Sequence, residues 1–352
     1  MKALVTGANG LIGANLVREL CAAGYEVRAF VRRTSDVRGL AGLAAEIVYG
    51  DVLQPETIAA AGEGCDLLFH TAAIFAYWGH TPDELATIAI EGARHAVEAA
   101  HRAGVRRVIL TSSSVVLGSS ARPILRDESA EAREQERPPY DSAKAAQERA
   151  AFRRAAELGV ELVAVCPTIS VGWPDYHLSP SNAVIVTYLN DPLRLTYPGG
   201  CNIVSARDVA RGHILAAEAG VPGERYVLGS ENLEWSTIHR TISELCGVPG
   251  PLLYTNHTGA YLAATAEELI AGWMRKRPAT TRTQAKMVGR YYWYRHDRAA
   301  ALGFAPRPAR RALAEAIAWL VASPHVSRQL RATLALSREV YEARRAIERQ
   351  AA

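Results

Sequence analysis

The chain has 352 residues, of which 49% are hydrophobic and 22% charged, a balance typical of an α/β enzyme with a nucleotide domain and a smaller lobe. Its 40 Lys and Arg residues exceed its 36 Asp and Glu residues only slightly, which argues against a nucleic-acid partner. No uninterrupted apolar stretch reaches the roughly 20 residues that cross a bilayer, and Met1 leads straight into a strand-like run rather than a signal peptide. We therefore expect a soluble protein with no membrane span.

The five cysteines are scattered through the chain and odd in number. No two of them have metal-ligand spacing, and none of the ten histidines belongs to a metal-binding motif. We expect a reducing, cytoplasmic location, no disulfide framework and no metal.

The first half of the chain alternates short apolar runs with longer helical patterns, which predicts βαβ units and a doubly wound parallel sheet of the Rossmann type. We assign residues 1–170 to this dinucleotide-binding domain, with a later return to it around 201–220. The expected strands are Ala3–Thr6, Glu26–Val31, Glu46–Tyr49, Asp66–His70, Arg107–Thr111 and Glu161–Cys166. The expected helices between them are Leu11–Ala23, Thr87–Ala103 and Ser142–Leu158.

After residue 170, turn-rich segments replace the alternation of strand and helix patterns. Residues 171–325 are expected to form mainly a smaller, mostly helical substrate lobe that closes over the carboxyl edge of the sheet. Residues 326–352 are expected to form a C-terminal amphipathic helix, with Ser327–Arg345 rich in alternating charge.

A glycine-rich turn, Gly7-Ala-Asn-Gly10-Leu-Ile-Gly13, follows the first expected strand and opens a helix. The first glycine permits a tight turn, the second lets the backbone approach a pyrophosphate, and the third lets helix and strand pack closely. Free N–H groups and the helix dipole then face the phosphates. The strand before, the helix after and the N-terminal position together favour a dinucleotide site over an ordinary turn.

Residues at the end of the second strand normally bind the adenosine ribose. An acidic residue there binds the 2′-hydroxyl of NAD, whereas an arginine binds the 2′-phosphate of NADP. Here Arg32 and Arg33 follow the strand, and no acid occurs before Asp36. Because guanidinium groups make charge-assisted bonds to phosphate, this pattern favours NADP, with NAD possible and a solvated surface pair as the alternative.

Tyr140 and Lys144 lie four residues apart in an expected helix and can therefore point into one site. An isolated tyrosine has a pKa of about 10 and is a poor acid–base catalyst at neutral pH. We expect the Lys144 cation, together with an oxidised nicotinamide, to lower the pKa of Tyr140 toward the working range. A surface pair of residues on a helix is the alternative reading of the same spacing.

The expected strand at 107–111 runs into Ser112, Ser113 and Ser114. Ligands of a doubly wound sheet bind beyond the carboxyl ends of its strands, so a serine at that edge can bond a substrate carbonyl beside Tyr140. A serine run also commonly caps a turn.

These motifs together resemble the extended short-chain dehydrogenase/reductase family, within the NAD-dependent epimerase/dehydratase superfamily. Within it, the chain is most similar to the branch of dihydroflavonol-4-reductase-like and hopanoid-associated sugar epimerase-like proteins. The matching motifs occur in family order over roughly residues 1–230. They are TGANGLIG at 6–13, Asp51-Val52, His70-Thr-Ala-Ala73, Thr111–Gly118, YDSAK at 140–144 and Cys166-Pro-Thr168.

The resemblance implies roles for individual residues. Ser113, aligned by its distance from Gly118, would orient the carbonyl, Tyr140 would be the acid or base, and Lys144 would hold the nicotinamide ribose and tune the tyrosine. Asp51 and Val52 would contact the adenine. The remaining implied cofactor contacts are Gly7, Asn9, Gly10, Leu11, Ile12, Gly13, Thr71, Ala72, Ala73, Pro167 and Thr168.

Aromatic and hydroxyl side chains near the ligand edge are candidates for substrate contacts. They are Phe75, Tyr77, Trp78, Ser114 and Tyr176, and packing against the small lobe is the alternative for the aromatic residues among them. A basic triplet, Arg275-Lys276-Arg277, is interpreted as a solvated helix end rather than an anion site.

The leading hypothesis is an NADP(H)-dependent carbonyl reductase or alcohol dehydrogenase that acts on a small-molecule ketone, aldehyde or alcohol. One alternative is a nucleotide-sugar epimerase with tightly held NAD, and another is a non-catalytic dinucleotide-binding sensor. The family resemblance also implies a homodimer, formed by helices on one face of the Rossmann domain.

Overall fold

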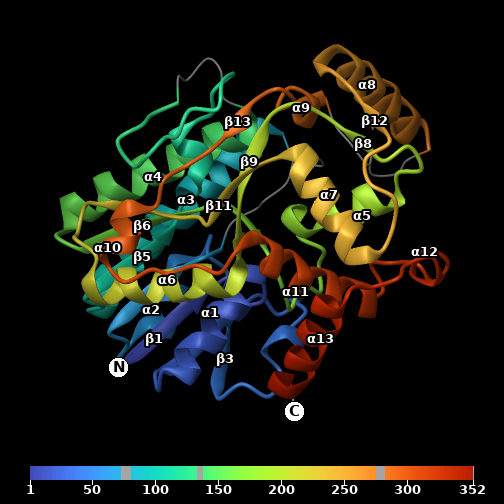
Figure 1. The fold of residues 1–352 in the computed structure, drawn as a ribbon. Helices are drawn as coiled ribbons and strands as arrows, with labels where there is room; N and C mark the ends of the chain where they lie inside the picture. The colour runs from blue at the N-terminus through green and yellow to red at the C-terminus, as the bar shows by residue number, and fades with distance from the viewer. Residues whose placement is uncertain (73–80, 133–137, 275–281, 352) are drawn as a thin grey trace.

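A seven-stranded, all-parallel sheet forms the centre of the computed structural model, which describes residues 1–72, 81–132, 138–274 and 282–351 (Figure 1). The strand order is β10-β6-β5-β4-β1-β2-β3, so the chain crosses over between β1 and β4. This is the doubly wound Rossmann arrangement that the sequence predicts, with one added strand at the β6 edge. The strands are β1 (Lys2–Thr6), β2 (Glu26–Val31), β3 (Ala45–Tyr49), β4 (Leu67–His70), β5 (Arg107–Thr111), β6 (Glu161–Pro167) and β10 (Arg225–Leu228).

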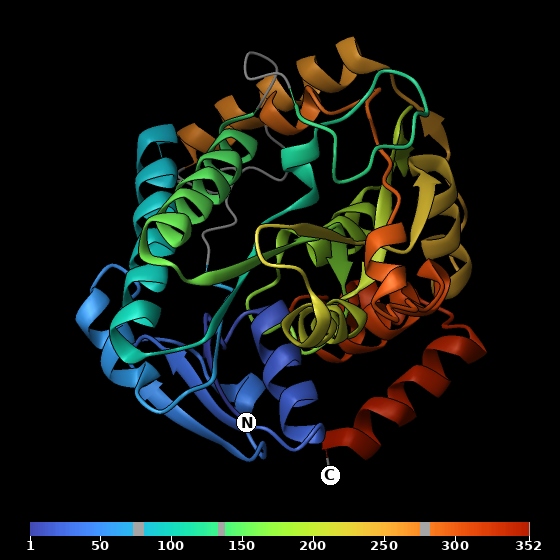
Figure 2. The same cartoon turned by 90° about the vertical axis from the view of Figure 1, so that its left-hand side faces the viewer.

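Helices cover both faces of this sheet because successive residues of each buried strand point to opposite sides. On one face, Val5 and Phe69 pack with α1 (Leu11–Ala22) and α6 (Ala206–Ala219). On the other face, Leu4 and Leu68 pack with three helices. These are α2 (Pro55–Gly62), α3 (Pro82–Ala103) and α4 (Pro139–Leu158), and Figure 2 shows α3 and α4 side by side.

A second lobe is built on a smaller sheet in which β9 (Gly200–Ser205) is central. It pairs in parallel with β7 (Ile169–Val171) and β13 (Tyr291–Tyr292), and antiparallel with β11 (Glu231–Glu234). An apolar core that includes Trp173, Ile203 and Ile317 joins this sheet to its helices. These helices are α5 (Pro180–Asn190), α7 (Trp235–Cys246) and α11 (Ala309–Ala322).

The remaining elements lie outside these two sheets. A two-stranded pair, β8 (Leu195–Thr196) with β12 (Leu253–Tyr254), precedes α8 (His257–Trp273) and α9 (Arg282–Ala285). A short helix, α10 (Asp297–Ala301), follows β13. Single 3₁₀ turns occur at Arg38–Leu40 and Ser114–Leu117.

The expected single helix over Ser327–Arg345 is wrong, because the structure divides this segment into α12 (Arg328–Ala332) and α13 (Arg338–Ala351). The break has a physical cause. The N–H groups of Ala335 and Ser337 donate to the carbonyls of Cys246 and Leu245, each at 2.9 Å. These carbonyls belong to the last turn of α7, so the segment between α12 and α13 satisfies groups that the end of a helix leaves unpaired.

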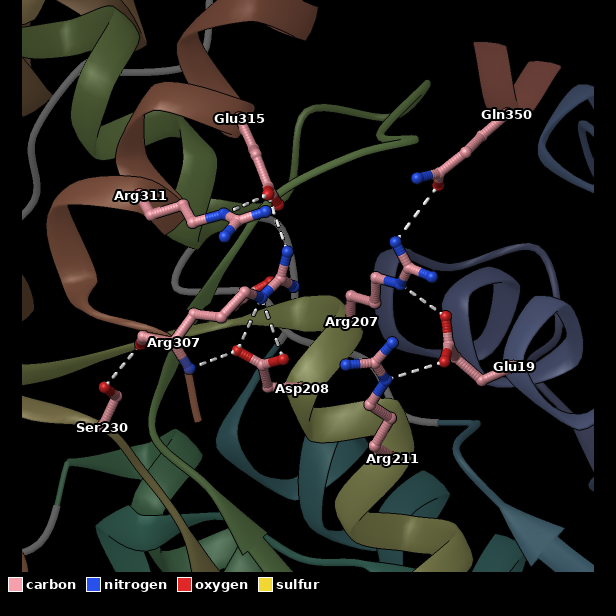
Figure 3. Close-up of polar contacts among 10 residues, drawn as sticks. Glu19, Arg207, Asp208, Arg211, Ser230, Arg307, Arg311, Glu315 and Gln350 are labelled. Carbon is pink, nitrogen blue, oxygen red and sulfur yellow. Dashed lines mark hydrogen bonds and ion pairs between the residues drawn. The ribbon is translucent and has the colours of Figure 1, made fainter. Parts of the chain in front are cut away.

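Charged side chains tie the Rossmann helices to the second lobe (Figure 3). Asp208 of α6 accepts from Arg307 Nε at 3.0 and 3.1 Å and from its backbone N–H at 2.9 Å. The same guanidinium donates to Glu315 of α11 at 2.6 Å. Glu19 of α1 in turn accepts from Arg207 at 2.6 Å and from Arg211 at 2.9 Å, both on α6. This network fixes α6 to α1 on one side and to α11 on the other.

Asp208→Asn should therefore destabilise the fold by about 3 kcal/mol, because it removes the charge opposite a largely buried guanidinium. Chemical denaturation of the purified protein measures this loss. Glu342→Gln, which alters an exposed pair with Arg338 on α13, is the control and should lose no more than about 0.5 kcal/mol. Equal, small losses in both variants would contradict a structural role for the network.

Candidate active site

The glycine turn between β1 and α1 brings two backbone segments into close contact. Gly7 has a φ of +68°, and a Cβ on it would lie 2.7 Å from the backbone N and Cα of Ala72. A side chain on Gly13 would likewise collide with the Gly7 carbonyl. Gly10 is the N-cap of α1 and offers no side chain to its first turn. The turn thus forms a cradle of backbone N–H groups at a positive helix end, which fits a pyrophosphate.

Neighbouring side chains hold this turn in place. Thr71 Oγ1 donates to the Thr6 carbonyl at 2.7 Å, which fixes the end of β4 to the end of β1. Asn15 Nδ2 donates at 2.8 Å to both the Leu11 carbonyl and the Trp173 carbonyl. Leu11 is buried and Ile12 is half-buried beneath the turn.

A segment of the second lobe reaches the same turn. His177 Nε2 lies 3.4 Å from the Asn9 side-chain nitrogen, although the two residues are 168 positions apart. His177 is a candidate neighbour of the cofactor, and the folded loop after β7 brings it to the turn.

The arginines after β2 are exposed at the sheet edge where an adenosine ribose is read. The Arg33 guanidinium lies 5.3 Å from the centre of the Tyr49 ring, and Arg32 precedes it in the chain. Asp36, the first acid of this loop, accepts from Arg38 at 2.9 Å, and this bond lowers the pKa of Asp36 to about 2. That carboxylate is therefore already engaged by an arginine of its own loop.

The Asp51-Val52 pair follows β3. The Asp51 carboxylate accepts from the Leu53 N–H at 2.9 Å, and the Val52 carbonyl lies 3.1 Å from His95 Nδ1. The pair is thus fixed between the start of α2 and α3 at the ligand edge of the sheet.

The three serines after β5 have three different partners. Ser112 donates to Glu148, which also binds Arg225 at 2.9 Å. Ser114 is buried beside the hydroxyl of Tyr294, which donates to the Gly118 carbonyl at 2.9 Å. Ser113, between them, accepts from the Val115 N–H at 3.4 Å and lies close enough to Tyr140 to lower the pKa of its phenol. Of the three, Ser113 is therefore the serine directed at the predicted acid–base residue.

Tyr140 lies in the first turn of α4 and is buried. Burial raises the pKa of Tyr140, and the nearby Asp141 carboxylate raises it further, while Ser113 opposes the shift. Lys144 is not among the groups that shift this pKa in the protein alone, so the expected lowering, which also involves an oxidised nicotinamide, stays a prediction. The phenol stays protonated at neutral pH.

The ammonium of Lys144 does not affect the pKa of Tyr140, because it is directed at other partners. Nζ donates to the Thr111 carbonyl at 2.9 Å and to Gln147 Oε1 at 2.7 Å. Burial lowers the pKa of Lys144 to about 8, although Cys166 and Glu148 favour its charged form. Gln147 belongs to none of the predicted motifs, and its position three residues after Lys144 on the same helix face is the only sign of it in the sequence.

Buried neutral histidines support the strand ends around these groups. His70 Nδ1 lies 3.0 Å from Thr6 Oγ1, and burial, with a smaller effect of Lys144, lowers the pKa of His70 to about 3. His213 Nε2 lies 2.8 Å from Thr111 Oγ1, and burial lowers the pKa of His213 to about 4.

The other predicted residues are placed as follows. Pro167 ends β6, and Thr168 Oγ1 donates to Asn202 at 2.8 Å. Tyr176 packs against Arg38 and Trp319, which places it by the loop after β2 rather than in the contacts around Tyr140. Ala73, Phe75, Tyr77 and Trp78 lie outside the described residues.

Comparison with known proteins identifies the family. The model of the NAD dependent epimerase/dehydratase family matches residues 3–229, which is more than half of the chain. The chain belongs to this family. The resemblance to extended short-chain dehydrogenases/reductases is thereby confirmed.

Relatives match over nearly the whole chain. Sterol demethylase protein B of Methylococcus capsulatus is 33% identical over 91% of this chain and 98% of its own length. A putative dihydroflavonol 4-reductase of Synechocystis is 31% identical over 92% of this chain and 96% of its own. The crystal structure of gox2253 superposes with a TM-score of 0.81 at 34% identity, over 92% of this chain and 99% of that one. The chain is an NAD(P)-dependent oxidoreductase with a Rossmann fold.

The buried histidines predict how stability depends on pH. The pKa of His213 is about 4 in the fold and about 6.5 in an unfolded chain, so the unfolded state binds more protons as the pH falls between these values. Stability should be full above pH 6.5 and should fall below it, by at most about 1.4 kcal/mol per pH unit for each such histidine. Urea unfolding between pH 8 and pH 4.5 measures the slope.

His213→Gln should make this acid slope shallower, because it removes one titrating group. Between pH 7 and pH 8 the variant and the parent should show the same slope, which is the internal control. A variant that keeps the full acid slope would show that His213 does not contribute.

Proposed function

We propose that this protein is an NADP(H)-dependent carbonyl reductase or alcohol dehydrogenase, acting on a small-molecule ketone or aldehyde or on the corresponding alcohol. The observation that carries the proposal is the placement of Ser113 beside Tyr140, one helical turn from Lys144, at the edge of the sheet where the glycine turn opens.

Tyr140 and Ser113 would act on the carbonyl oxygen. A protonated, buried phenol is suited to give its proton to that oxygen as the carbonyl carbon is reduced. The Ser113 hydroxyl would hold the oxygen at the same time, since its neighbours Ser112 and Ser114 are engaged elsewhere. In the oxidation direction the same groups would accept the proton.

Lys144 would position the cofactor and tune the site. Its bonds to the Thr111 carbonyl and Gln147 fix Nζ between β5 and α4. One of its protons would be available to a ribose hydroxyl. When bound, the nicotinamide supplies or accepts the hydride.

The glycine turn and the arginines after β2 would hold the rest of the cofactor. Gly7, Gly10 and Gly13 form the pyrophosphate cradle, and Arg32 and Arg33 would bind the 2′-phosphate of NADP. The engagement of Asp36 by Arg38 supports NADP over NAD, because that acid is not left to bind ribose hydroxyls. A homodimer and a cytoplasmic location remain part of this proposal, and the five free thiols are consistent with a reducing compartment.

Tyr140→Phe should lower kcat for carbonyl reduction by about 10²- to 10⁴-fold, because it removes the proton donor but not the ring. NADPH affinity, measured by fluorescence titration, should change little. Tyr341→Phe, which alters an exposed phenol on α13, is the matched control. Full turnover by Tyr140→Phe would refute the mechanism.

The same assay distinguishes the two alternatives. A nucleotide-sugar epimerase would retain NAD through purification and show no net cofactor turnover. A sensor would bind NADPH but turn over no member of a broad carbonyl panel.

Replacing Arg32 and Arg33 together by serine should weaken NADPH binding by about 10- to 100-fold, because charge-assisted bonds to a phosphate are lost. NADH binding should change far less. Calorimetric titration with both cofactors measures the difference, and Arg102→Ser at an exposed site on α3 controls for the loss of a surface charge. Equal losses for NADPH and NADH would show that these arginines do not read the 2′-phosphate.

A further inference from the structure

Gln147 binds the ammonium group of Lys144. Its side-chain oxygen Oε1 accepts from Lys144 Nζ at 2.7 Å, and the Thr111 carbonyl accepts from the same nitrogen at 2.9 Å. One acceptor belongs to α4 and the other to the end of β5, so the ammonium is held between a helix and a strand. Because a lysine ammonium has three N–H donors, these two bonds also fix the direction of the third.

Both partners of this bond are enclosed by the protein. Gln147 is 1% exposed and Lys144 is 4% exposed. Bulk water therefore cannot replace the amide unless the packing around it changes. An apolar side chain would fill the same space without the cost of burying an amide, which the bond to Lys144 offsets. This indicates that the amide is there for the lysine.

Both groups that accept from Lys144 Nζ among the described residues are neutral, one a backbone carbonyl and the other an amide. The carboxylate that favours its charged form, Glu148, accepts instead from Ser112 and, at 2.9 Å, from Arg225 Nη1. The Arg225 guanidinium offsets much of the attraction between Glu148 and Lys144. A neutral amide holds an ammonium in place but retains its proton less firmly than a carboxylate would.

Four further titratable side chains around Lys144 are neutral at neutral pH. They are Tyr140 of α4, His70 of β4, Cys166 of β6 and His213 of α6, which binds Thr111 Oγ1. Burial raises the pKa of the phenol and of the thiol, and lowers the pKa of each histidine. The Asp141 carboxylate, in the preceding turn of α4, acts on Tyr140. The acceptor at position 147 therefore has a direct effect on Lys144.

We propose that Gln147 is the positioning residue of Lys144. Its amide oxygen orients Nζ so that one N–H is left for a cofactor hydroxyl, and its neutrality leaves the lysine able to release a proton. A glutamate at this position would retain the charge of the ammonium, and an apolar residue would leave Nζ with the Thr111 carbonyl alone. The effect on Lys144 stands on these contacts, whereas its consequence for catalysis rests on the function proposed above.

NMR titration of the lysines tests the effect on Lys144 without cofactor or substrate. The chain contains four lysines, Lys2, Lys144, Lys276 and Lys286, so protein with isotope-labelled lysine Cε gives few signals. Lys144→Met identifies the signal of Lys144 by its loss. The midpoint of each lysine is then read from its chemical shift between about pH 6 and about pH 11.

Gln147→Leu should lower the midpoint of Lys144 by about one pH unit or more, because a buried hydrogen bond to the charged form is lost. Gln147→Glu should raise it by a similar amount, because a carboxylate takes the place of the amide. Lys2 on β1 is the internal reference and should keep its midpoint. Gln329→Leu, at an exposed glutamine on α12, is the matched control and should leave Lys144 as in the wild type.

Thermal unfolding separates positioning from packing. A lower melting temperature with an unchanged Lys144 midpoint would overturn the proposal, because it would show that Gln147 only fills the core. If Gln147→Leu does not fold, Gln147→Glu, which keeps the shape of the side chain, decides alone, and an unchanged midpoint in that variant overturns the proposal.

Carbonyl reduction by the same variants tests the consequence for catalysis. The limb of the pH–rate profile that follows Lys144 should move in the same direction as its NMR midpoint. A limb that stays fixed while the midpoint moves would overturn the catalytic role of Gln147. A protein that reduces no carbonyl would instead refute the proposed function and leave the NMR result intact, so the two proposals fail separately.

Discussion

The parallel register of four central strands determines where every group of the candidate site lies. Thr6 of β1 is level with His70 of β4, which is level with Leu110 of β5, and Thr111 of β5 is level with Val165 of β6. The carboxyl ends therefore meet at one edge, where the glycine turn, the serine run and Thr71 all begin. Because Gly7 has no Cβ, the turns after β1 and β4 can contact each other. Without that contact, the glycine turn and the turn after β4 would not lie together at this edge of the sheet.

Burial, rather than direct pairing of charges, sets the protonation states of the titratable side chains at this edge of the sheet. It raises the pKa of Tyr140 and lowers those of Lys144 and His70, in each case favouring the neutral form. A neutral phenol is a proton donor, which suits the reduction of a carbonyl. A cationic nicotinamide close to the phenol would favour the phenolate, which suits the reverse reaction. The same two side chains can thus serve both directions, with the charge of the cofactor deciding between them.

Sequence patterns predicted the parts of the fold that depend on local periodicity. The bounds of β2 and β5 are those expected, and the glycine turn, Tyr140 and Lys144 lie at the predicted edge. The family resemblance singled out Ser113, but patterns could not find the partners of Ser112 and Ser114, because these come from distant elements. The break between α12 and α13 was missed for the same reason, since its cause is the last turn of α7 rather than any local residue.

Amphipathic periodicity also leaves open what an apolar face meets. In α13, Val340 and Ile347 repeat at helical spacing and are buried in the core around α11. In α8, Leu262, Leu269 and Trp273 repeat in the same way, yet the folded chain leaves them facing outward. Both patterns say that the helix carries an apolar face, and only the fold says whether the chain itself covers it.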